Sequence, residues 1–481
     1  MGGVPEFAHR GVVEGFYGRP YAHADRLWLL EQMGRWGMNR YVHAPKNDPL
    51  HRDRWREPYG REALAELGAL VAHGAEHGVE VGFAVSPGLS MEYASREDRE
   101  ALARKLGAFH GLGARFFGLA LDDVPSRLVH EGDRRAFPGL AEAHVAVAHE
   151  LLGRLEDSRL WLVPTDYSGA EPTDYLETLG ATLEPAVEVG WTGRTIVSPT
   201  VRADEARRRA RTLRRPLLLW DNVPVSDGPM RSLLHLGPYL GREPGLAEHC
   251  SGVLLNPMEH PRASGVALQC AARFLADPAG YDPEAAWETA LAERGAGAPE
   301  AFRRFAEALR FSALAPGERD RELEAAFAEL RAAAAGSAAE ARARDALAAL
   351  LAEREQAVPA LREGLADRRL AEELEPWLDA HARETRRMAR AVSLLATLAG
   401  DAPRFDQAMA FFAFESVLNE PLPAKVTYGP RRVLYPQLVS LREDEAGFGE
   451  DPALFTGRSL SDEIVAHAES RAATHLGARR G

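Results

Sequence analysis

Two adjacent carboxylates, Asp122 and Asp123, stand at the end of a short aliphatic run in the first half of the chain. Paired carboxyl groups are the usual means of breaking a glycosidic bond. Neighbouring side chains on an extended strand point to opposite faces, so both can reach one ligand only where the strand has ended. Val124-Pro125 directly follows the pair and favours a turn there.

The spacing of this pair limits the sugar chemistry that it could serve. In an ordinary retaining double displacement, acid and nucleophile lie on opposite sides of the sugar, ~5 Å apart, which suits adjacent residues badly. In substrate-assisted hydrolysis the nucleophile is the sugar's own 2-acetamido oxygen. One carboxylate then protonates the leaving oxygen while its neighbour orients the acetamido nitrogen. On spacing alone, such a pair is more often a solvated turn or a helix cap. Whether it is catalytic depends on the residues at the ends of the neighbouring strands.

Eight β-branched or aliphatic runs recur in the first half of the chain, with helix-like stretches between them. The runs are 11–16, 39–44, 80–86, 116–122, 160–166, 186–191, 216–221 and 252–256. Eight βα units in about 280 residues predict an α/β fold, a (β/α)8 barrel of the TIM type, whose chemistry lies where the strands end. A doubly wound open sheet is the competing fold, but no G-x-G-x-x-G follows the first run.

Polar and aromatic residues follow most of these runs. They are Gly15 and Tyr17 after the first, Lys46 with His51 and Arg52 after the second, Tyr167 after the fifth, Trp220, Asn222 and Asp227 around the end of the seventh, and Asn256 after the eighth. Planar polar groups bind sugar hydroxyls and aromatic faces pack on the C–H side, so their convergence predicts a sugar pocket.

The composition changes near residue 283, where a stretch rich in Ala, Glu, Arg and Leu begins. One helical stripe within it comprises Trp377, His381, Thr385, Met388, Val392 and Leu395. This pattern predicts a C-terminal α-helical bundle. We therefore expect a catalytic barrel at 1–282, the bundle at 283–400, and a mostly helical extension with a flexible tail at 401–481.

Charge and cysteine content exclude several classes of protein. The 481 residues carry a net charge of −13, which argues against nucleic acid or an anionic membrane as the main partner. The Arg-rich run 206–215 is interpreted as the solvated face of a barrel helix. Only Cys250 and Cys270 occur, so no disulfide framework or Cys-rich metal site is available. Neither a secretory signal nor a bilayer-spanning run is visible, and a cytoplasmic location is expected.

The ends of the runs carry motifs that resemble glycoside hydrolase family 84. In order over about residues 9–275 they read GVVEGFYGRP, YVHAPKNDPLHRDRWREPY, AVSPGL, FFGLALDDV, VPTDY, WTG, LLLWDNVPVSDG and LLNPMEHP. That family contains β-N-acetylglucosaminidases that act as protein O-GlcNAcases, and bacterial relatives once called hyaluronidases. Its members carry helical bundles after the barrel, which the helical segment suits without being diagnostic.

The resemblance implies a role for each matched residue. Asp122 would hold the acetamido N–H, and Asp123 would be the general acid and then the general base. The other implied contacts are Tyr167 with the acetamido oxygen, Trp220 and Asn222 with the acetyl group, Asp227 and Asn256 with the 4- and 6-hydroxyls, Lys46 and the Gly15 carbonyl with the 3-hydroxyl side, and Tyr17 with the pocket wall. The implied activity is a retaining exo-β-N-acetylglucosaminidase that forms an oxazoline, without metal or cofactor, on a GlcNAc-bearing glycoconjugate or glycoprotein. Analogy with the family suggests a homodimer through the helical part.

Three alternatives stay open at this point. A GlcNAc-binding or scaffolding protein would keep the pocket without turnover, although it has no need for the acid pair. An endo-acting, hyaluronidase-like glycosidase would need an open groove. A metal-dependent barrel hydrolase could use His43 and His51, but neither H-x-H nor H-E-x-x-H is present. A glycoprotein, a muropeptide fragment and a chitooligosaccharide all fit as substrate.

Overall fold

A computed structural model describes most of the chain. The described residues are 6–310, 312, 314–315, 318–400, 402–418, 435–437, 449–451 and 459–478. They fall into two compact units. Residues 6–228 and 239–286 belong to a barrel unit, and residues 229–238 join most of the described residues after 286 in a helical unit.

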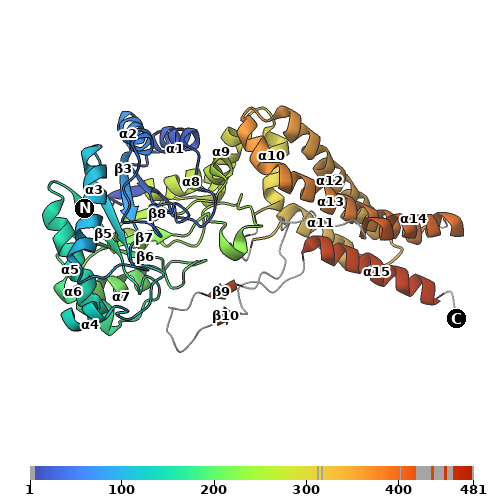
Figure 1. Cartoon of the computed structure of the whole chain (residues 1–481). Helices are drawn as coiled ribbons and strands as arrows, with labels where there is room; N and C mark the ends of the chain where they lie inside the picture. Colours follow the sequence, from blue (N-terminus) through green and yellow to red (C-terminus); the bar gives the residue numbers. More distant parts are fainter. Residues whose placement is uncertain are drawn as a thin grey trace. The chain divides into compact units, whose positions relative to one another are not determined.

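Eight parallel strands close into a barrel, in which each strand pairs with the next and β8 pairs with β1 (Figure 1). The strands are β1 His9–Glu14, β2 Arg40–His43, β3 Glu80–Val85, β4 Phe116–Ala120, β5 Arg159–Val163, β6 Glu188–Trp191, β7 Leu217–Asp221 and β8 Cys250–Leu255. Each overlaps one of the predicted runs. The predicted TIM-type barrel is confirmed, and the closed sheet excludes the doubly wound alternative.

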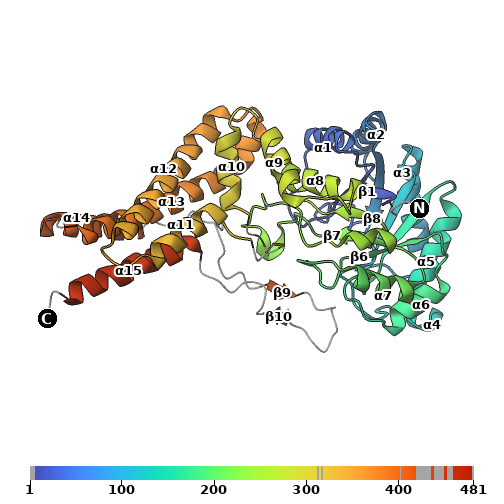
Figure 2. The ribbon, with the colours of Figure 1, turned by 180° about the vertical axis from the view of Figure 1, so that it is seen from behind.

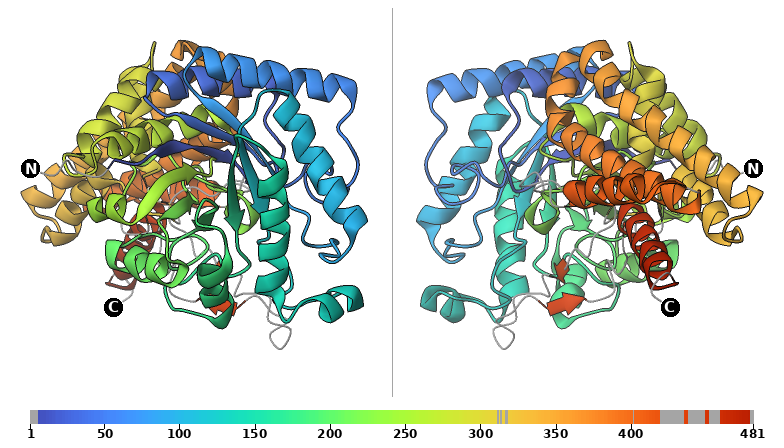
Figure 3. Two further views of the ribbon diagram at one scale, coloured as in Figure 1. Left: turned by 90° about the vertical axis from the view of Figure 1, so that its left-hand side faces the viewer. Right: turned by 90° about the vertical axis from the view of Figure 1, so that its right-hand side faces the viewer.

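Helices cover the outside of the barrel, as the views in Figures 2 and 3 show. They are α1 His23–Arg35, α2 Arg61–Glu76, α3 Arg96–Gly111, α4 Glu131–Ala136, α5 Leu140–Arg154, α6 Asp174–Thr182, α7 Ala203–Leu213 and α8 Pro261–Ala276, with the short 3-10 helices η1 Gly228–Met230 and η2 Pro244–Glu248. The Ser95 hydroxyl caps the start of α3, because it accepts from the Asp98 amide at 3.2 Å.

Buried side chains fill the inside of the barrel. This inner cluster comprises Val13, Val42, Ala44, Ala84, Phe116, Ala120, Trp161, Val163, Leu218, Trp220 and Leu254. The Phe116 and Trp161 rings stack with centroids 6.1 Å apart, and Trp220 lies next to Trp161 at 5.9 Å. The inside of the barrel is therefore filled with side chains. Trp220, near the end of β7, lies at the carboxyl end of this core.

The helical unit is the predicted bundle, which completes the predicted fold class. Its helices, with α9 spanning the change of unit, are α9 Pro283–Arg294, α10 Pro299–Ala308, α11 Arg321–Ala332, α12 Ala338–Gly364, α13 Arg368–Ala399, α14 Arg404–Leu418 and α15 Leu460–Ala478; the short strands β9 Tyr435–Gln437 and β10 Gly449–Asp451 form a separate pair. The whole predicted stripe on α13, from Trp377 to Leu395, is buried. The boundaries predicted for the three parts stay predictions, and much of 401–481 lies outside the described residues.

The Arg-rich run lies on α7 and just beyond it, but it is not a wholly solvated face. Arg209 and Arg215 are buried and donate to backbone carbonyls, among them Asp166 O at 2.8 Å and Val187 O at 2.8 Å, because buried guanidinium donors need acceptors. For these two residues the solvated interpretation is wrong.

Cys250 and Cys270 are buried free thiols, and burial raises the pKa of Cys250 to about 12. Among the described residues, no helix is both long enough and apolar enough to cross a membrane.

Candidate active site

The acid pair lies in a tight turn after β4. The strand ends at Ala120, and Asp123 adopts a left-handed backbone conformation with φ 52°. A residue other than glycine costs on the order of 1–3 kcal/mol in such a region, which tends to be retained where function needs the geometry. The turn breaks the alternation of an extended strand. Asp123 consequently accepts a hydrogen bond from Tyr167, which follows β5, and the charges of both carboxylates raise the pKa of that tyrosine, together with burial.

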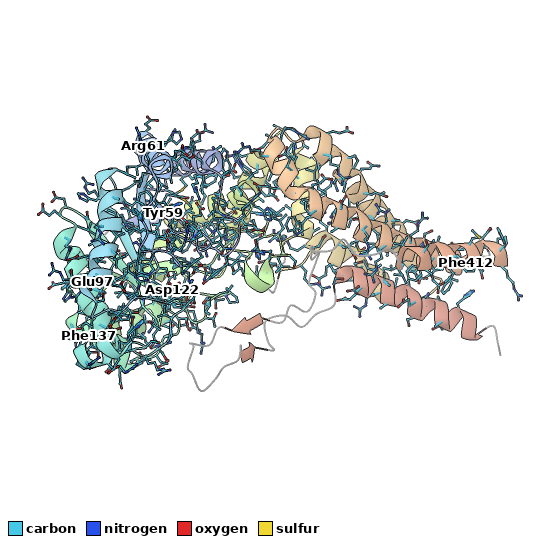
Figure 4. All side chains as sticks on the ribbon, in the orientation of Figure 1. Tyr59, Arg61, Glu97, Asp122, Phe137 and Phe412 are labelled. Carbon is cyan, nitrogen blue, oxygen red and sulfur yellow. The ribbon has the colours of Figure 1, made fainter. Side chains whose placement is uncertain are left out.

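Asp122 forms a buried ion pair with Lys46, which follows β2. Lys46 Nζ donates to Asp122 Oδ2 at 2.5 Å, and the two side chains are 3% and 10% exposed. Asp122 Oδ1 is also buried, yet it makes no hydrogen bond to any described residue. Buried carboxylate oxygens are normally satisfied, so Oδ1 is an acceptor that suits a ligand donor. Figure 4 labels Asp122 among the side chains of the barrel.

Asp123 accepts hydrogen bonds on both oxygens from tyrosine hydroxyls. Tyr17, after β1, donates to Oδ2 at 2.7 Å, and Tyr167 donates to Oδ1 at 2.9 Å. Burial raises the pKa of both tyrosines, and the negative charge of Asp123 raises it further. Both hydroxyls therefore stay protonated and serve as donors.

Arg52 is a functional candidate to which the sequence interpretation gave no role. Its Nη1 donates to the Tyr17 hydroxyl at 2.6 Å and lies 4.0 Å from Asp123 Oδ2. The available signal was a cation shortly after the second predicted strand, on the same connection as Lys46. That signal placed Arg52 among the predicted pocket residues but gave it no role, and the nearby Arg54 is exposed.

A second group of predicted residues surrounds the Trp220 ring. The Asn222 side-chain oxygen accepts from Trp220 Nε1 at 3.0 Å and from Asn256 Nδ2 at 2.9 Å. Asn222 Nδ2 donates to the Ile196 carbonyl at 2.6 Å, which fixes the orientation of the amide. The Gly15 amide donates to Asn256 Oδ1 at 3.3 Å, and a Cβ on Gly15 would lie 2.3 Å from the Trp220 ring. Only glycine allows this approach.

Asp227 contacts the first group, and Lys46 lies near the second. Asp227 Oδ2 accepts from the Tyr17 amide at 2.8 Å, and Lys46 Nζ lies 5.9 Å from the centroid of the Trp220 ring. All ten predicted site residues therefore take part in one of three hydrogen-bonded or ion-paired groups that follow the strands at their carboxyl ends.

Other carboxylates at the strand ends are structural. Glu14 accepts from Arg26 at 2.7 Å and 2.8 Å and also from Tyr41. Asp221 accepts from Tyr239 at 2.6 Å and from Arg242 at 2.5 Å. Each is paired with an arginine, whereas Asp122 keeps one oxygen without a hydrogen bond. Of Glu14, Asp122 and Asp221, Asp122 is therefore the carboxylate with an oxygen left to accept from a ligand.

The histidines of the metal-dependent alternative are core residues. His51 Nδ1 lies 2.9 Å from the Ala84 carbonyl, and burial lowers the pKa of His51 to about 3. In the described part of the chain, the group whose donor atoms could hold a metal ion is Glu31, His73 and His77, none of which belongs to the set above.

Comparison with known proteins gives a consistent result. The model of a beta-N-acetylglucosaminidase family matches residues 10–307. Protein O-GlcNAcase from Rattus norvegicus and from Mus musculus are each 34% identical over 271 residues, 55% of this chain and 29% of theirs. The chain thus spans less than a third of these relatives.

Solved structures extend the likeness beyond the barrel. A mutant of the Thermobaculum terrenum O-GlcNAc hydrolase superposes with a TM-score of 0.82 at 28% identity, over 98% of this chain and 97% of that one. The structure of CpGH84B gives 0.76 at 26% identity, over 88% and 75%.

Proposed function

Because this chain belongs to the beta-N-acetylglucosaminidase family, glycoside hydrolase family 84, we propose that it is a retaining exo-β-N-acetylglucosaminidase that uses substrate-assisted catalysis. This is the same family that the sequence motifs resemble. One observation carries the mechanism: the buried Asp122 has one oxygen held by Lys46 and a second oxygen that makes no hydrogen bond to the described protein.

Asp122 is proposed to bind and orient the 2-acetamido group. Its free Oδ1 accepts the acetamido N–H, which increases the negative charge on the acetamido oxygen and directs that oxygen at C1. The Lys46 ammonium compensates the buried Asp122 charge while this happens. Positive charge that develops on the acetamido nitrogen as the oxazoline closes is stabilised by the Asp122 anion.

Asp123 is proposed to carry the proton in both half-reactions. In the first, the bond from the acetamido oxygen to C1 forms, the glycosidic C1–O bond breaks, and Asp123 gives its proton to the leaving oxygen. In the second, a water attacks C1 from the face that the leaving group vacated. Asp123 then takes the proton of the water, and the oxazoline ring opens. The two displacements at C1 give net retention.

The remaining residues are proposed to shape the subsite. Trp220 walls the acetyl group, and Asn222, whose amide is fixed by Ile196 and Asn256, orients it. The Tyr167 hydroxyl turns from Asp123 to the acetamido oxygen when substrate binds. Asp227 and Asn256 bind the 4- and 6-hydroxyls, while Lys46, the Gly15 carbonyl and Tyr17 line the 3-hydroxyl side.

The proposed substrate class is a terminal β-linked GlcNAc on serine or threonine of a glycoprotein. Support comes from the similar solved structure, which is that of an O-GlcNAc hydrolase. The two chains superpose over nearly their whole lengths. The test compares a GlcNAc-Ser peptide, chitobiose, a muropeptide fragment and hyaluronan, with NMR of the anomeric proton of the first product. Initial release of β-GlcNAc from the peptide supports the proposal. An inverted product, binding without hydrolysis, or cleavage of internal hyaluronan bonds contradicts it.

Two further expectations concern the whole protein. A homodimer through the helical unit is supported by α14, which exposes Phe405, Met409 and Phe412 on one stripe at 73%, 51% and 64% (Figure 4 labels Phe412). Light scattering of Met409→Ser/Phe412→Ser against the parent chain tests this, since a dimer that uses this stripe should dissociate. A cytoplasmic location stays an expectation from the sequence.

A further inference from the structure

We propose that Arg52 is a positioning residue that acts through Tyr17 on the general acid Asp123. This role rests on the proposed glycosidase function, and neither the motifs nor the comparisons assign it. Three residues from the ends of three strands form a continuous chain: Arg52 Nη1 to the Tyr17 hydroxyl at 2.6 Å, and that hydroxyl to Asp123 Oδ2 at 2.7 Å.

The direction of both hydrogen bonds follows from the chemistry of arginine. A guanidinium has five N–H donors and no acceptor. The Tyr17 oxygen must therefore accept from Arg52, and the single hydroxyl hydrogen is left for Asp123. Without Arg52 the hydroxyl could rotate and accept from another donor. Arg52 thereby fixes Tyr17 as a donor to the acid.

The two oxygens of Asp123 consequently have different tasks. Oδ2 is held by Tyr17, while Oδ1 accepts from Tyr167 at 2.9 Å. When the acetamido oxygen takes the Tyr167 hydroxyl, Oδ1 becomes free and Oδ2 stays bound. The transferable proton therefore lies on Oδ1 and passes from there to the leaving oxygen.

Arg52 also stabilises the charge that this proton transfer creates. Its guanidinium lies 4.0 Å from Asp123 Oδ2, and its side chain is 11% exposed, so bulk water screens the interaction little. A nearby cation and a donated hydrogen bond both favour the carboxylate that remains. Because the carboxylate forms only as the proton leaves, the benefit grows with the extent of proton transfer.

The test uses Arg52→Met, Arg52→Lys, Tyr17→Phe and the Arg52→Met/Tyr17→Phe pair on aryl β-GlcNAc substrates of graded leaving-group ability. Arg52→Met should lose on the order of 10²-fold in kcat with poor leaving groups and only a few-fold with very good ones, with KM little changed. Arg52→Lys should recover part of the loss. The loss in the double variant should be smaller than the product of the two single losses, because both substitutions break one chain and only the direct contact of Arg52 with Asp123 acts outside it. Arg54→Met, at an exposed neighbouring position, is the matched control.

Several outcomes overturn the role. Equal loss for all leaving groups would mean that Arg52 only maintains the pocket, and additive losses in the double variant would mean that Arg52 and Tyr17 act separately. A parent chain that does not hydrolyse aryl β-GlcNAc contradicts the proposed function instead. So does an Asp123→Asn variant without dependence on the leaving group.

A cluster of two histidines and one glutamate lies on the outside of the barrel, away from the candidate active site. We propose that Glu31, His73 and His77 bind a divalent transition-metal ion of the Zn²⁺ class. His73 and His77 are four residues apart at the end of α2, Glu31 lies on α1, and their donor atoms all lie within 4.8 Å of one another. Two imidazoles and a carboxylate are ligands that Zn²⁺ takes, with a fourth position left for water.

His73 has the surroundings of a ligating imidazole. Its Nε2 is buried, makes no hydrogen bond in the described part of the chain, and lies 3.5 Å from Glu31 Oε1. Its Nδ1 lies 3.7 Å from Glu76 Oε2. A histidine that binds a metal through one nitrogen commonly gives its other N–H to a carboxylate, which fixes the ring.

The position of this cluster separates it from catalysis. The ends of α1 and α2 lead into the starts of β2 and β3, whereas the candidate active-site residues lie where the strands finish. A bound ion would tie α1 to α2 and raise the midpoint of thermal unfolding by mass action, without changing turnover.

Calorimetric titration of ZnCl2 into chelator-treated full-length protein tests the site. One ion should bind per chain, binding should disappear in His73→Ala, and Glu76→Gln should weaken it about 10-fold. His110→Ala is the control, because His110 lies outside the cluster and should not alter binding. No zinc binding in the parent, or unchanged binding in a folded His73→Ala, overturns the proposal.

Discussion

Lys46 Nζ lies 2.5 Å from Asp122 Oδ2, and this buried ion pair joins the connection after β2 to the turn after β4. The pair occupies one oxygen of the carboxylate and leaves the other for a ligand. It gives Lys46 a task besides the hydroxyl contact implied by the resemblance. Replacing either partner leaves a buried charge without compensation, which is costly because both side chains are removed from solvent.

Removal of this cation should impair catalysis strongly. Lys46→Met should lower kcat/KM for 4-nitrophenyl β-GlcNAc on the order of 10²-fold or more, because the Asp122 anion loses its partner and its fixed orientation. Arg61→Met, at the exposed start of α2, should be neutral. Steady-state kinetics of the two variants decides the matter. A Lys46→Met enzyme with parental kcat/KM would contradict the importance of the pair.

The acid and the orienting residue should respond differently to the leaving group. Asp123→Asn should nearly abolish turnover of substrates with poor leaving groups and retain more activity with very good ones, since protonation matters less there. Asp122→Asn should lose activity with all of them, because the oxazoline step requires Asp122 whatever leaves. Plots of log kcat/KM against leaving-group ability for both variants test this. Parallel plots would count against the assignment.

The close approach of Gly15 to Trp220 should not tolerate a methyl group. A Cβ at Gly15 would lie 2.3 Å from Trp220 Cζ2, so Gly15→Ala should displace the ring, reduce activity and cost about 1–3 kcal/mol of stability. Gly107→Ala is the matched control, because Gly107 lies within α3 and a methyl group there would have nothing within 4 Å of it. That change should be neutral or stabilising by up to ~1 kcal/mol. Urea unfolding and kinetics measure both.

The buried Asp221–Arg242 pair at the end of β7 should matter for stability. Both side chains are 2% exposed, and Asp221 also accepts from the Tyr239 hydroxyl at 2.6 Å. Arg242→Met leaves the carboxylate without its cation and should cost about 3–5 kcal/mol in the free energy of unfolding. Arg202→Met, an exposed arginine that precedes α7, should change stability little. Equal unfolding midpoints for the two variants would contradict this.

His144 should make stability depend on acid pH. Burial lowers its pKa to about 3 from a usual value of 6.5. Below pH 6.5 the unfolded chain binds a proton at this residue while the folded chain does not. This lowers the free energy of unfolding by about 1.4 kcal/mol per pH unit as pH falls toward 3. In His144→Gln that contribution is absent. The difference between the two chains, measured by urea unfolding at pH 7 and pH 5, should therefore shift in favour of the variant at pH 5.

Local patterns were sufficient for the fold. The eight strand runs and the buried stripe on α13 depend on side chains close in sequence. The structure reproduces them because the hydrophobic period acts over a few residues. The Arg-rich run shows the limit of such patterns. Its polarity predicted exposure, yet Arg209 and Arg215 are buried against carbonyls contributed by distant segments.

For the site, the sequence by itself determined which residues stand at the strand ends, and parallel strands in a closed barrel necessarily bring those ends together. Only the tertiary structure decided how they pair: Lys46 with Asp122, Arg52 with Tyr17, and both tyrosines with Asp123. Such pairings depend on distances of a few ångströms between residues far apart in the chain. They are set by the left-handed turn at Asp123 and by the packing around Trp220, which no local pattern encodes.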